Sequence, residues 1–235
     1  MSDHTSSQFD AEMELIRSGV LSMGGLVETQ LQRAIDSLEE SENTNLRDVV
    51  GAAEQQINSF QVQIDQQCAQ IIAKRQPTAV DLRMILTVTK VVNDLERIGD
   101  EVKKIAYKAS ESQGFQRLAG VRIFEVARVA GAALEMLQHA LDSFARLDVE
   151  AAAAIIDEDK QVDAGFHAIL RQLISYMMED PRTITAALEL VFVAKSVERI
   201  GDHAKNIAEA VVQVVKGKDV RHATADQIRA EVAEQ

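Results

Sequence analysis

Glu96-Arg-Ile-Gly-Asp-Glu-Val-Lys-Lys-Ile-Ala106 is a stretch that the chain repeats as Glu198-Arg-Ile-Gly-Asp-His-Ala-Lys-Asn-Ile-Ala208. Eight of the eleven positions are identical, and the second copy begins 102 residues after the first. Each copy places two acidic residues four positions apart, with a glycine beside the second. On a helix, such like charges repel by roughly a few tenths of a kcal/mol, and an internal glycine costs roughly 1 kcal/mol more. Because the same unfavourable choice is made twice, we expect a compensating partner, and a bound cation is the simplest candidate.

The apolar residues around both copies follow a helical spacing. From Met84 to Ile105 they are alternately four and three positions apart, and from Ala186 to Val214 they keep the same register. This seam is typical of helices that pack against one another. Pro77 and Pro181 each lie near an expected helix start, where a missing N–H costs little. The sequence predicts an all-α fold with helices at about 8–41, 45–75, 78–111, 116–146, 149–179 and 182–216.

The predicted organisation is a three-helix unit used twice, giving two tandem three-helix bundles related by an internal repeat. Gln113-Gly114 is the one clear joint between the halves. We expect a first bundle at residues 1–113, a second at 114–218 and a C-terminal tail at 219–235. Short connections favour antiparallel neighbours within each bundle.

The repeated acids lie on the side of their helices away from the apolar seam. At 100° per residue, Glu96 and Asp100 are well over 90° from the seam centre, so a site there is expected on the bundle surface. The preceding helix of each half carries a matching pair of oxygen side chains, which can meet these acids if the two helices are antiparallel neighbours. The candidate metal ligands are Glu54, Asn58, Glu96, Asp100, Asp159, Asp163, Glu198 and Asp202.

All these candidate ligands bind through oxygen, which suits hard or borderline cations best. No Cys/His pattern of a structural zinc site accompanies them. The expected cofactor is therefore a divalent or iron-type cation (Mg, Mn, Fe or Zn), and its identity stays open.

The residues alone also allow several explanations of these motifs that need no bound metal. Arg97 and Arg199 can pair with the acids and remove the need for a metal. Gly99 and Gly201 can serve close helix packing rather than ligand access. His203 is expected to be exposed rather than a ligand, whereas Asn206 offers an additional oxygen.

Composition limits the partners. A net charge of −12 argues against nucleic acid and against simple adhesion to anionic lipid, because both need a basic surface. Cys68 is the only cysteine, so no intramolecular disulfide can form, and its helical surroundings favour inert burial. The N-terminus lacks the pattern of a signal peptide, and no apolar run is long enough to cross a bilayer. We therefore expect a cytoplasmic protein that reaches membranes only through partner proteins.

The chain resembles the PhoU family of phosphate-signalling proteins over nearly its whole length. The resemblance rests on the paired Glu-Arg-Ile-Gly-Asp motifs and on the segments that precede them, Pro77-Thr-Ala-Val-Asp-Leu-Arg83 and Tyr176-Met-Met-Glu-Asp-Pro-Arg182. The ending Val215-Lys-Gly-Lys-Asp-Val-Arg-His222 is similar to the proteobacterial branch.

This resemblance implies two pseudo-twofold-related bundles with surface metal clusters at the acid pairs. It also implies a homodimeric cytoplasmic adaptor, not an enzyme, that links the ATPase subunit of a phosphate ABC transporter to a sensor histidine kinase. Such an adaptor holds the phosphate-starvation response off when phosphate is plentiful. The first half departs from the pattern, because Asn58 stands where the second half has Asp163. We therefore expect weaker metal binding in the first half.

Two other functions compete with the adaptor. A di-metal carboxylate enzyme in a helical bundle needs inward-facing Glu-x-x-His motifs, and the sequence contains none. A metal-free helical scaffold with solvated acid faces is the second competitor.

Overall fold

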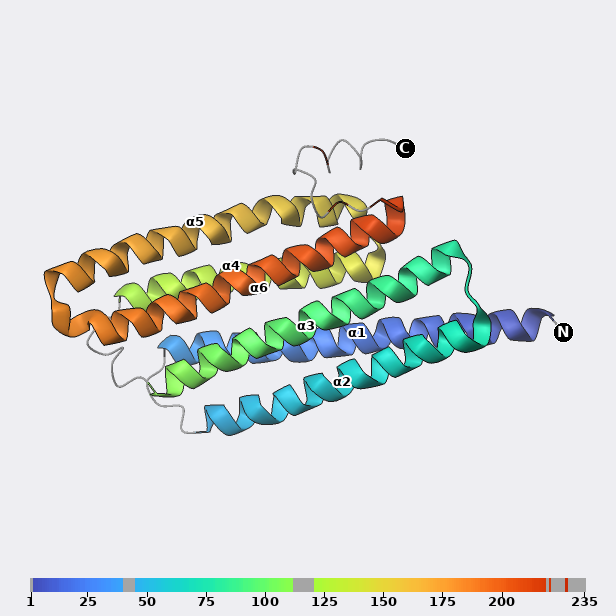
Figure 1. Cartoon of the computed structure of the whole chain (residues 1–235), viewed down its shortest axis with the longest axis horizontal. Coiled ribbons are helices and arrows are strands. Elements are labelled where there is room, and N and C mark those ends of the chain that lie inside the picture. The colour runs from blue at the N-terminus through green and yellow to red at the C-terminus, as the bar shows by residue number, and fades with distance from the viewer. Residues whose placement is uncertain (1, 40–44, 112–120, 219, 221–226, 228–235) are drawn as a thin grey trace.

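A computed structural model describes the chain except for residue 1 and residues 40–44, 112–120, 219, 221–226 and 228–235 (Figure 1). It confirms the predicted all-α fold, with six α-helices, a single 3-10 turn and no strand in the part of the chain that it covers. The elements are α1 (Ser2–Glu39), α2 (Leu46–Arg75), α3 (Ala79–Glu111), α4 (Val121–Arg146), α5 (Val149–Glu179), η2 (Pro181–Thr183) and α6 (Ile184–Lys216).

Most helix boundaries lie within two residues of those expected. α1 begins at Ser2 rather than near residue 8, and α6 begins at Ile184 because Pro181 opens a separate turn. The side chain of Asp180 accepts a hydrogen bond from the backbone N–H of Arg182 in that turn. The expected start of the fourth helix at 116, the joint Gln113-Gly114 and most of the 219–235 tail lie outside the described residues, so the division into two domains stays a prediction.

Each half is a group of three long helices that pack against one another (Figure 1). α2 and α3 are antiparallel neighbours, as are α5 and α6. The two groups meet mainly where α3 packs on α6, and α1 also packs on α4. Buried apolar residues from both groups form one continuous core. The predicted seam lies in that core, since Val88, Leu95 and Ile105 are fully buried.

The α3–α6 contact is antiparallel and nearly symmetric. Near one end of α3, Lys90 donates to Gln213, and near the other end Lys108 lies 3.8 Å from Glu189. Within the contact, Ser196 donates to Glu101 over 2.9 Å, and the ring Nδ1 of His203 lies 2.8 Å from Asp94. The repeat exchanges these last two pairs, because Glu101 corresponds to His203 and Asp94 to Ser196. The internal repeat therefore appears in space as a pseudo-twofold relation between the bundles.

Among the residues that the structure describes, no helix combines the length and apolar character needed to span a bilayer.

Candidate metal centres

The second half brings its four candidate ligands to one place between α5 and α6. Asp159 and Asp163 are one turn apart on α5, and Glu198 and Asp202 are one turn apart on α6. Because the helices run antiparallel, the two pairs face each other across the helix contact. We call these four residues the second acid cluster.

Gly201 sets how closely α5 and α6 approach at this cluster. A Cβ atom at residue 201 would lie 3.2 Å from Cγ1 of Val162 and 3.6 Å from Oδ1 of Asp159. Gly99 has the same role in the first half, where an added Cβ would lie 3.1 Å from Cδ1 of Ile57. Both glycines therefore serve close helix packing. That packing is also what brings the α5 acids beside the α6 acids.

Asp159 is the buried member of the second acid cluster, with 3% of its surface exposed. Its Oδ2 accepts a hydrogen bond from Nζ of Lys205 over 2.8 Å. Its Oδ1 is buried and has no hydrogen-bond partner among the described residues. Leaving a carboxylate oxygen buried and unpaired is costly, so this atom is suited to a ligand from outside the chain. The expectation of a surface site rested on the acids of α3 and α6. Asp159 of α5 lies deeper than its partners, since Asp202 is exposed and Glu198 is half-buried.

The carboxylates of the cluster lie close enough to perturb one another. The pKa of Asp202 is raised above its usual value, first by partial burial and then by the negative charges of Glu198 and the α5 aspartates. The pKa of Asp163 is raised by burial, then by the charge of Asp159 and by that of Glu198. Mutual repulsion of this kind is what a bound cation relieves.

Lysines partly neutralise the second acid cluster. Lys205 pairs with Asp159, and Lys195 pairs with Glu198. With the side chains placed in this way, no group of three Asp, Glu, His or Cys residues in the described ranges is close enough to hold one metal ion. The donor set suits a hard cation, but binding requires at least one lysine to move away from its carboxylate.

The first half repeats the arrangement with fewer charges, and we call Glu54, Asn58, Glu96 and Asp100 the first acid cluster. The pKa of Glu96 is raised, first by partial burial, then by the charge of Asp100, with a smaller contribution from Glu54. Nζ of Lys103 lies 2.6 Å from Glu54, as Lys205 pairs with Asp159 in the second half. Asn58 is an exposed residue of α2 and contributes no charge.

The two repeat arginines behave differently. Arg97 lies 3.7 Å from Glu96 and 4.0 Å from Asp100, so it partly neutralises the first acid cluster, as the alternative reading of the sequence allowed. Arg199 instead crosses to α3, where its guanidinium lies 3.0 Å from Glu101. The second acid cluster is therefore left without its repeat arginine.

His203 and Asn206 belong to the bundle contact rather than to the second acid cluster. His203 is partly buried against Asp94, which corrects the expectation that it is exposed. Asn206 turns its amide N–H toward the same carboxylate, over 3.1 Å, instead of offering an oxygen to a metal. Asp94 was missed in the sequence because it lies outside the repeated stretch.

Sequence reasoning also missed the lysines that neutralise the clusters. Lys103 and Lys205 occupy one of the eight identical positions of the repeat. Their conservation between the two copies was a signal that could have been used. It was hidden because the ionic partners, Glu54 and Asp159, lie on a different helix.

Comparison with known proteins also detects the internal repeat. A family model described as "PhoU domain" matches residues 20–109 and again residues 126–211. A protein of Pseudomonas aeruginosa named "Phosphate-specific transport system accessory protein PhoU homolog" is 43% identical over 234 residues, covering 99% of this chain and 95% of that protein. The Escherichia coli protein named "Phosphate-specific transport system accessory protein PhoU" is 43% identical over 230 residues, covering 97% and 93%.

Two solved structures share the fold. The crystal structure of PhoU from Pseudomonas aeruginosa superposes with a TM-score of 0.83 at 42% identity, covering 89% of this chain and 100% of that one. The phosphate transport system regulatory protein PhoU from Streptococcus pneumoniae gives a TM-score of 0.82 at 25% identity, covering 90% and 99%. The likeness thus extends over both halves of the chain.

Proposed function

This chain belongs to the PhoU family, and from that membership together with the two acid clusters we propose that it is a metal-binding adaptor protein of phosphate homeostasis. In this role it acts in the cytoplasm as a homodimer and is not an enzyme. It links the ATPase subunit of a phosphate ABC transporter to a sensor histidine kinase, and it represses the phosphate-starvation response when phosphate is plentiful. The names of relatives that match nearly end to end support the connection with phosphate transport.

The unpaired buried Oδ1 of Asp159 is the observation that carries metal binding. Asp159, Asp163, Glu198 and Asp202 would hold the ion in the second half, and the first acid cluster would hold one more weakly. A bound cation supplies positive charge that cancels the repulsion among the carboxylates. The residues themselves then fix the spacing of α5 and α6, and so the shape of the surface that partners meet.

Metal analysis of protein purified without a histidine tag tests this role. We expect Mn²⁺ or Fe²⁺, at about a hundred times the dissociation constant, to raise the melting temperature by roughly 5 to 10 °C. The Asp159→Asn/Asp202→Asn variant should lose most of this shift. Asp142→Asn, an exposed acid of α4, should keep all of it. No bound metal and no shift in the unmodified chain would overturn the metal role.

The adaptor role is tested separately by isolating the native protein from membranes of cells grown at high and low phosphate. We expect the transporter ATPase and the histidine kinase to be recovered with it, in proportions that change with phosphate. Recovery of neither protein at either phosphate level would contradict the adaptor role.

A metal-free scaffold is the second candidate, and the lysine pairs favour it. Lys103, Lys195 and Lys205 already neutralise part of each cluster without any ion. The two candidates differ in the Lys205→Met variant. In a scaffold it destabilises the chain under all conditions, whereas in a metal-binding protein added Mn²⁺ restores the lost stability.

A further inference from the structure

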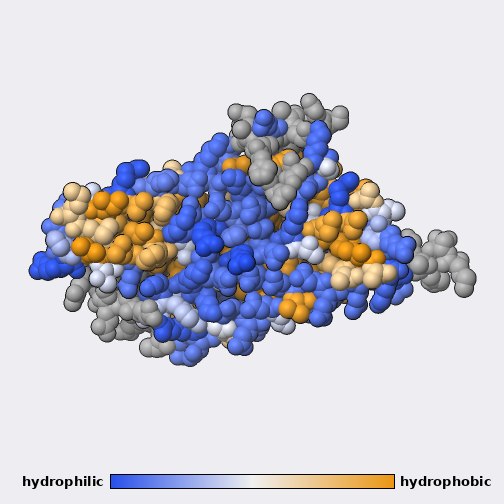
Figure 2. Space-filling model, viewed as in Figure 1, coloured by the Kyte–Doolittle hydropathy of each residue, from blue (hydrophilic) through white to orange (hydrophobic). Residues whose placement is uncertain are grey.

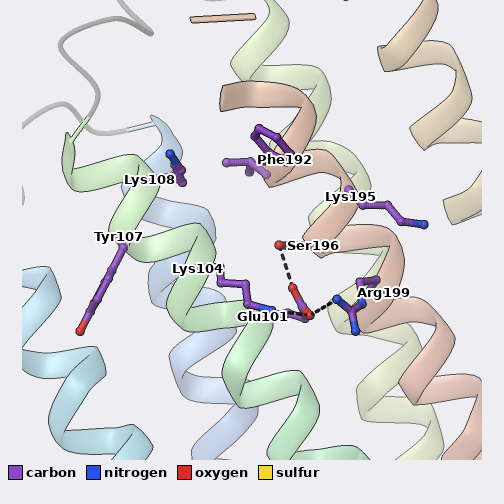
Figure 3. A pocket seen from close by; sticks show the side chains of 9 residues that line it. Glu101, Lys104, Tyr107, Lys108, Phe192, Lys195, Ser196 and Arg199 are labelled. Atoms are coloured by element: carbon purple, nitrogen blue, oxygen red, sulfur yellow. Dashed lines mark hydrogen bonds and ion pairs between the residues drawn. The ribbon is translucent and has the colours of Figure 1, made fainter. Parts of the chain in front are cut away.

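A cavity of roughly 470 Å³ lies between α3 and α6 (Figure 3). This volume is typical of sites for small molecules. Figure 3 shows Phe192 and Lys108 toward one end and Glu101 with Arg199 toward the other. The lining residues are Glu101, Lys104, Tyr107, Lys108, Phe192, Val193, Lys195, Ser196 and Arg199.

The cavity is basic in a chain whose net charge is −12. Lys104 and Arg199 both reach the Glu101 carboxylate, at 2.9 and 3.0 Å, so two positive charges meet a single negative one. Glu101 is 3% exposed and also accepts a hydrogen bond from Ser196. Lys108 adds a third cation, and its ion pair with Glu189 is long, at 3.8 Å. The accessible charge in the cavity is therefore positive.

These cations are available to a ligand. The side chains of Lys104 and Arg199 are about half exposed, so each can contact a ligand from its solvent side while it stays paired with the buried Glu101. Lys195 is different, because Figure 3 shows its chain turned away from the cavity, and it pairs with Glu198. Tyr107 also turns away, toward α2, where Arg47 lies over its ring.

Phe192 gives the cavity an apolar wall. Its side chain is 62% exposed, so a ligand in the cavity can reach the ring. Figure 2 shows hydrophobic surface at the end of the molecule where α6 begins, beside a hydrophilic middle. Ile184, Leu188 and Phe192 are exposed apolar residues of this part of α6. A flat apolar group lying against this ring would remove both surfaces from water.

The internal repeat does not account for this combination. Across the pseudo-twofold axis, the equivalent positions carry a different chemistry. The counterparts of Lys104, Lys108 and Phe192 are Asn206, Ala210 and Lys90. The basic and aromatic lining is thus confined to one side of a duplicated interface, which is what a site for an asymmetric ligand needs.

We propose that the cavity binds a nucleotide-type anion, with its phosphate at Lys104, Lys108 and Arg199 and its flat base against Phe192. Guanidinium and ammonium groups bind phosphate oxygens through charge-assisted hydrogen bonds. Glu101, held beneath them by Ser196, positions Lys104 and Arg199. Because α3 and α6 each supply part of the site, the ligand joins the two bundles.

Isothermal titration calorimetry of the full chain with AMP, adenosine and inorganic phosphate tests the proposal. We expect AMP to bind saturably at one site, and adenosine and phosphate each to bind at least about tenfold more weakly, because each offers only half of the contacts. The Lys104→Gln/Lys108→Gln variant should weaken AMP binding at least about tenfold. Phe192→Ala should weaken AMP binding and leave the weaker phosphate binding unchanged.

Lys160→Gln is the matched control, since Lys160 is an exposed lysine of α5 with an ion pair of the same kind, to Asp157. It should bind AMP as the unmodified chain does. Circular dichroism verifies that each variant is folded. Equal AMP affinity in the Lys104→Gln/Lys108→Gln variant, equal affinity for AMP and phosphate, or no saturable AMP binding at about millimolar concentration would each overturn the proposal.

Discussion

Gly99 and Gly201 occupy equivalent positions at the residue scale, but their neighbours differ in stiffness. An added methyl at residue 201 would meet Cγ1 of Val162, a β-branched side chain with a single preferred rotamer in a helix. At residue 99 it would meet Cδ1, the flexible end of Ile57. The terminal methyl of Ile57 can therefore move aside for an added methyl group, whereas Val162 cannot.

We therefore expect Gly201→Ala to lower the free energy of unfolding by about 1 kcal/mol, since overpacking exceeds the gain in helix propensity. Gly99→Ala should be close to neutral or stabilising. Urea denaturation measures both. A loss of the same size at both positions would show that side-chain stiffness does not decide the outcome.

Cys68 is 2% exposed, and burial, followed by the charge of Asp65, raises the pKa of its thiol to about 11. The reactive thiolate forms only as the pH approaches that value, so at pH 8 about one thiol in a thousand is ionised. We expect Cys68 to react with a thiol reagent far more slowly in the folded chain than in denaturant. Rapid labelling at pH 8 under native conditions would contradict its burial.

At the element scale, the two middle helices begin differently. The side chain of Asp148 caps α5 by accepting a hydrogen bond from the N–H of Ala151 over 3.0 Å. Asn45 holds the same position before α2 and makes no such side-chain bond. Residue type alone would favour both as caps. The backbone conformation at the start of each helix decides whether the residue there caps it.

Asp148→Ala should lower the free energy of unfolding by about 1 kcal/mol, because it leaves an N–H of the first turn without its partner. Asn45→Ala removes no side-chain cap bond, so its effect should be within a few tenths of a kcal/mol of zero, by roughly the same rule. Thermal or urea unfolding separates the two. Equal losses would mean that Asn45 also caps its helix in solution.

At the scale of the whole molecule, Glu101 is the charged residue buried most deeply in the contact between bundles. It accepts a hydrogen bond from Ser196 and pairs with Lys104 and Arg199. Asp94, the acid in the symmetry-related part of the contact, accepts a hydrogen bond from Asn206, contacts His203 and is less buried. Glu101→Ala should cost about 2 kcal/mol of stability, because hydrogen bonds to a charged group are lost together. Asp94→Ala should cost less. Differential scanning calorimetry measures the stability that each variant loses. A larger loss for Asp94→Ala than for Glu101→Ala would contradict this expected order.

The two halves also differ in the charge of their acid clusters, and the difference centres on Asn58. In a chain whose second acid cluster is removed by Asp159→Asn/Asp202→Asn, we expect only weak Mn²⁺ binding at the first. Adding Asn58→Asp should strengthen that binding about tenfold, since it restores the fourth carboxylate. Calorimetric titration measures it. Tight binding by the first acid cluster before this change would contradict the expected order of affinity.

Local pattern was enough to predict the six helices, because apolar residues every three or four positions specify a helix and its buried face. Repetition of Glu-Arg-Ile-Gly-Asp was enough to select Glu96, Asp100, Glu198 and Asp202 as candidate ligands that share a helix face in pairs, since their spacing is a property of one helix. The family resemblance came from the same short segments. These features depend on residues near one another in the chain.

Only the tertiary structure decided which partners these residues have. Arg97 and Arg199 are identical in sequence context, yet one neutralises its own cluster and the other crosses to Glu101. Burial of Asp159 and the basic cavity at Phe192 likewise depend on how α5, α3 and α6 approach one another. A repeat copies local sequence, but each copy packs against different neighbours, and ionic partners are chosen by distance in space rather than along the chain.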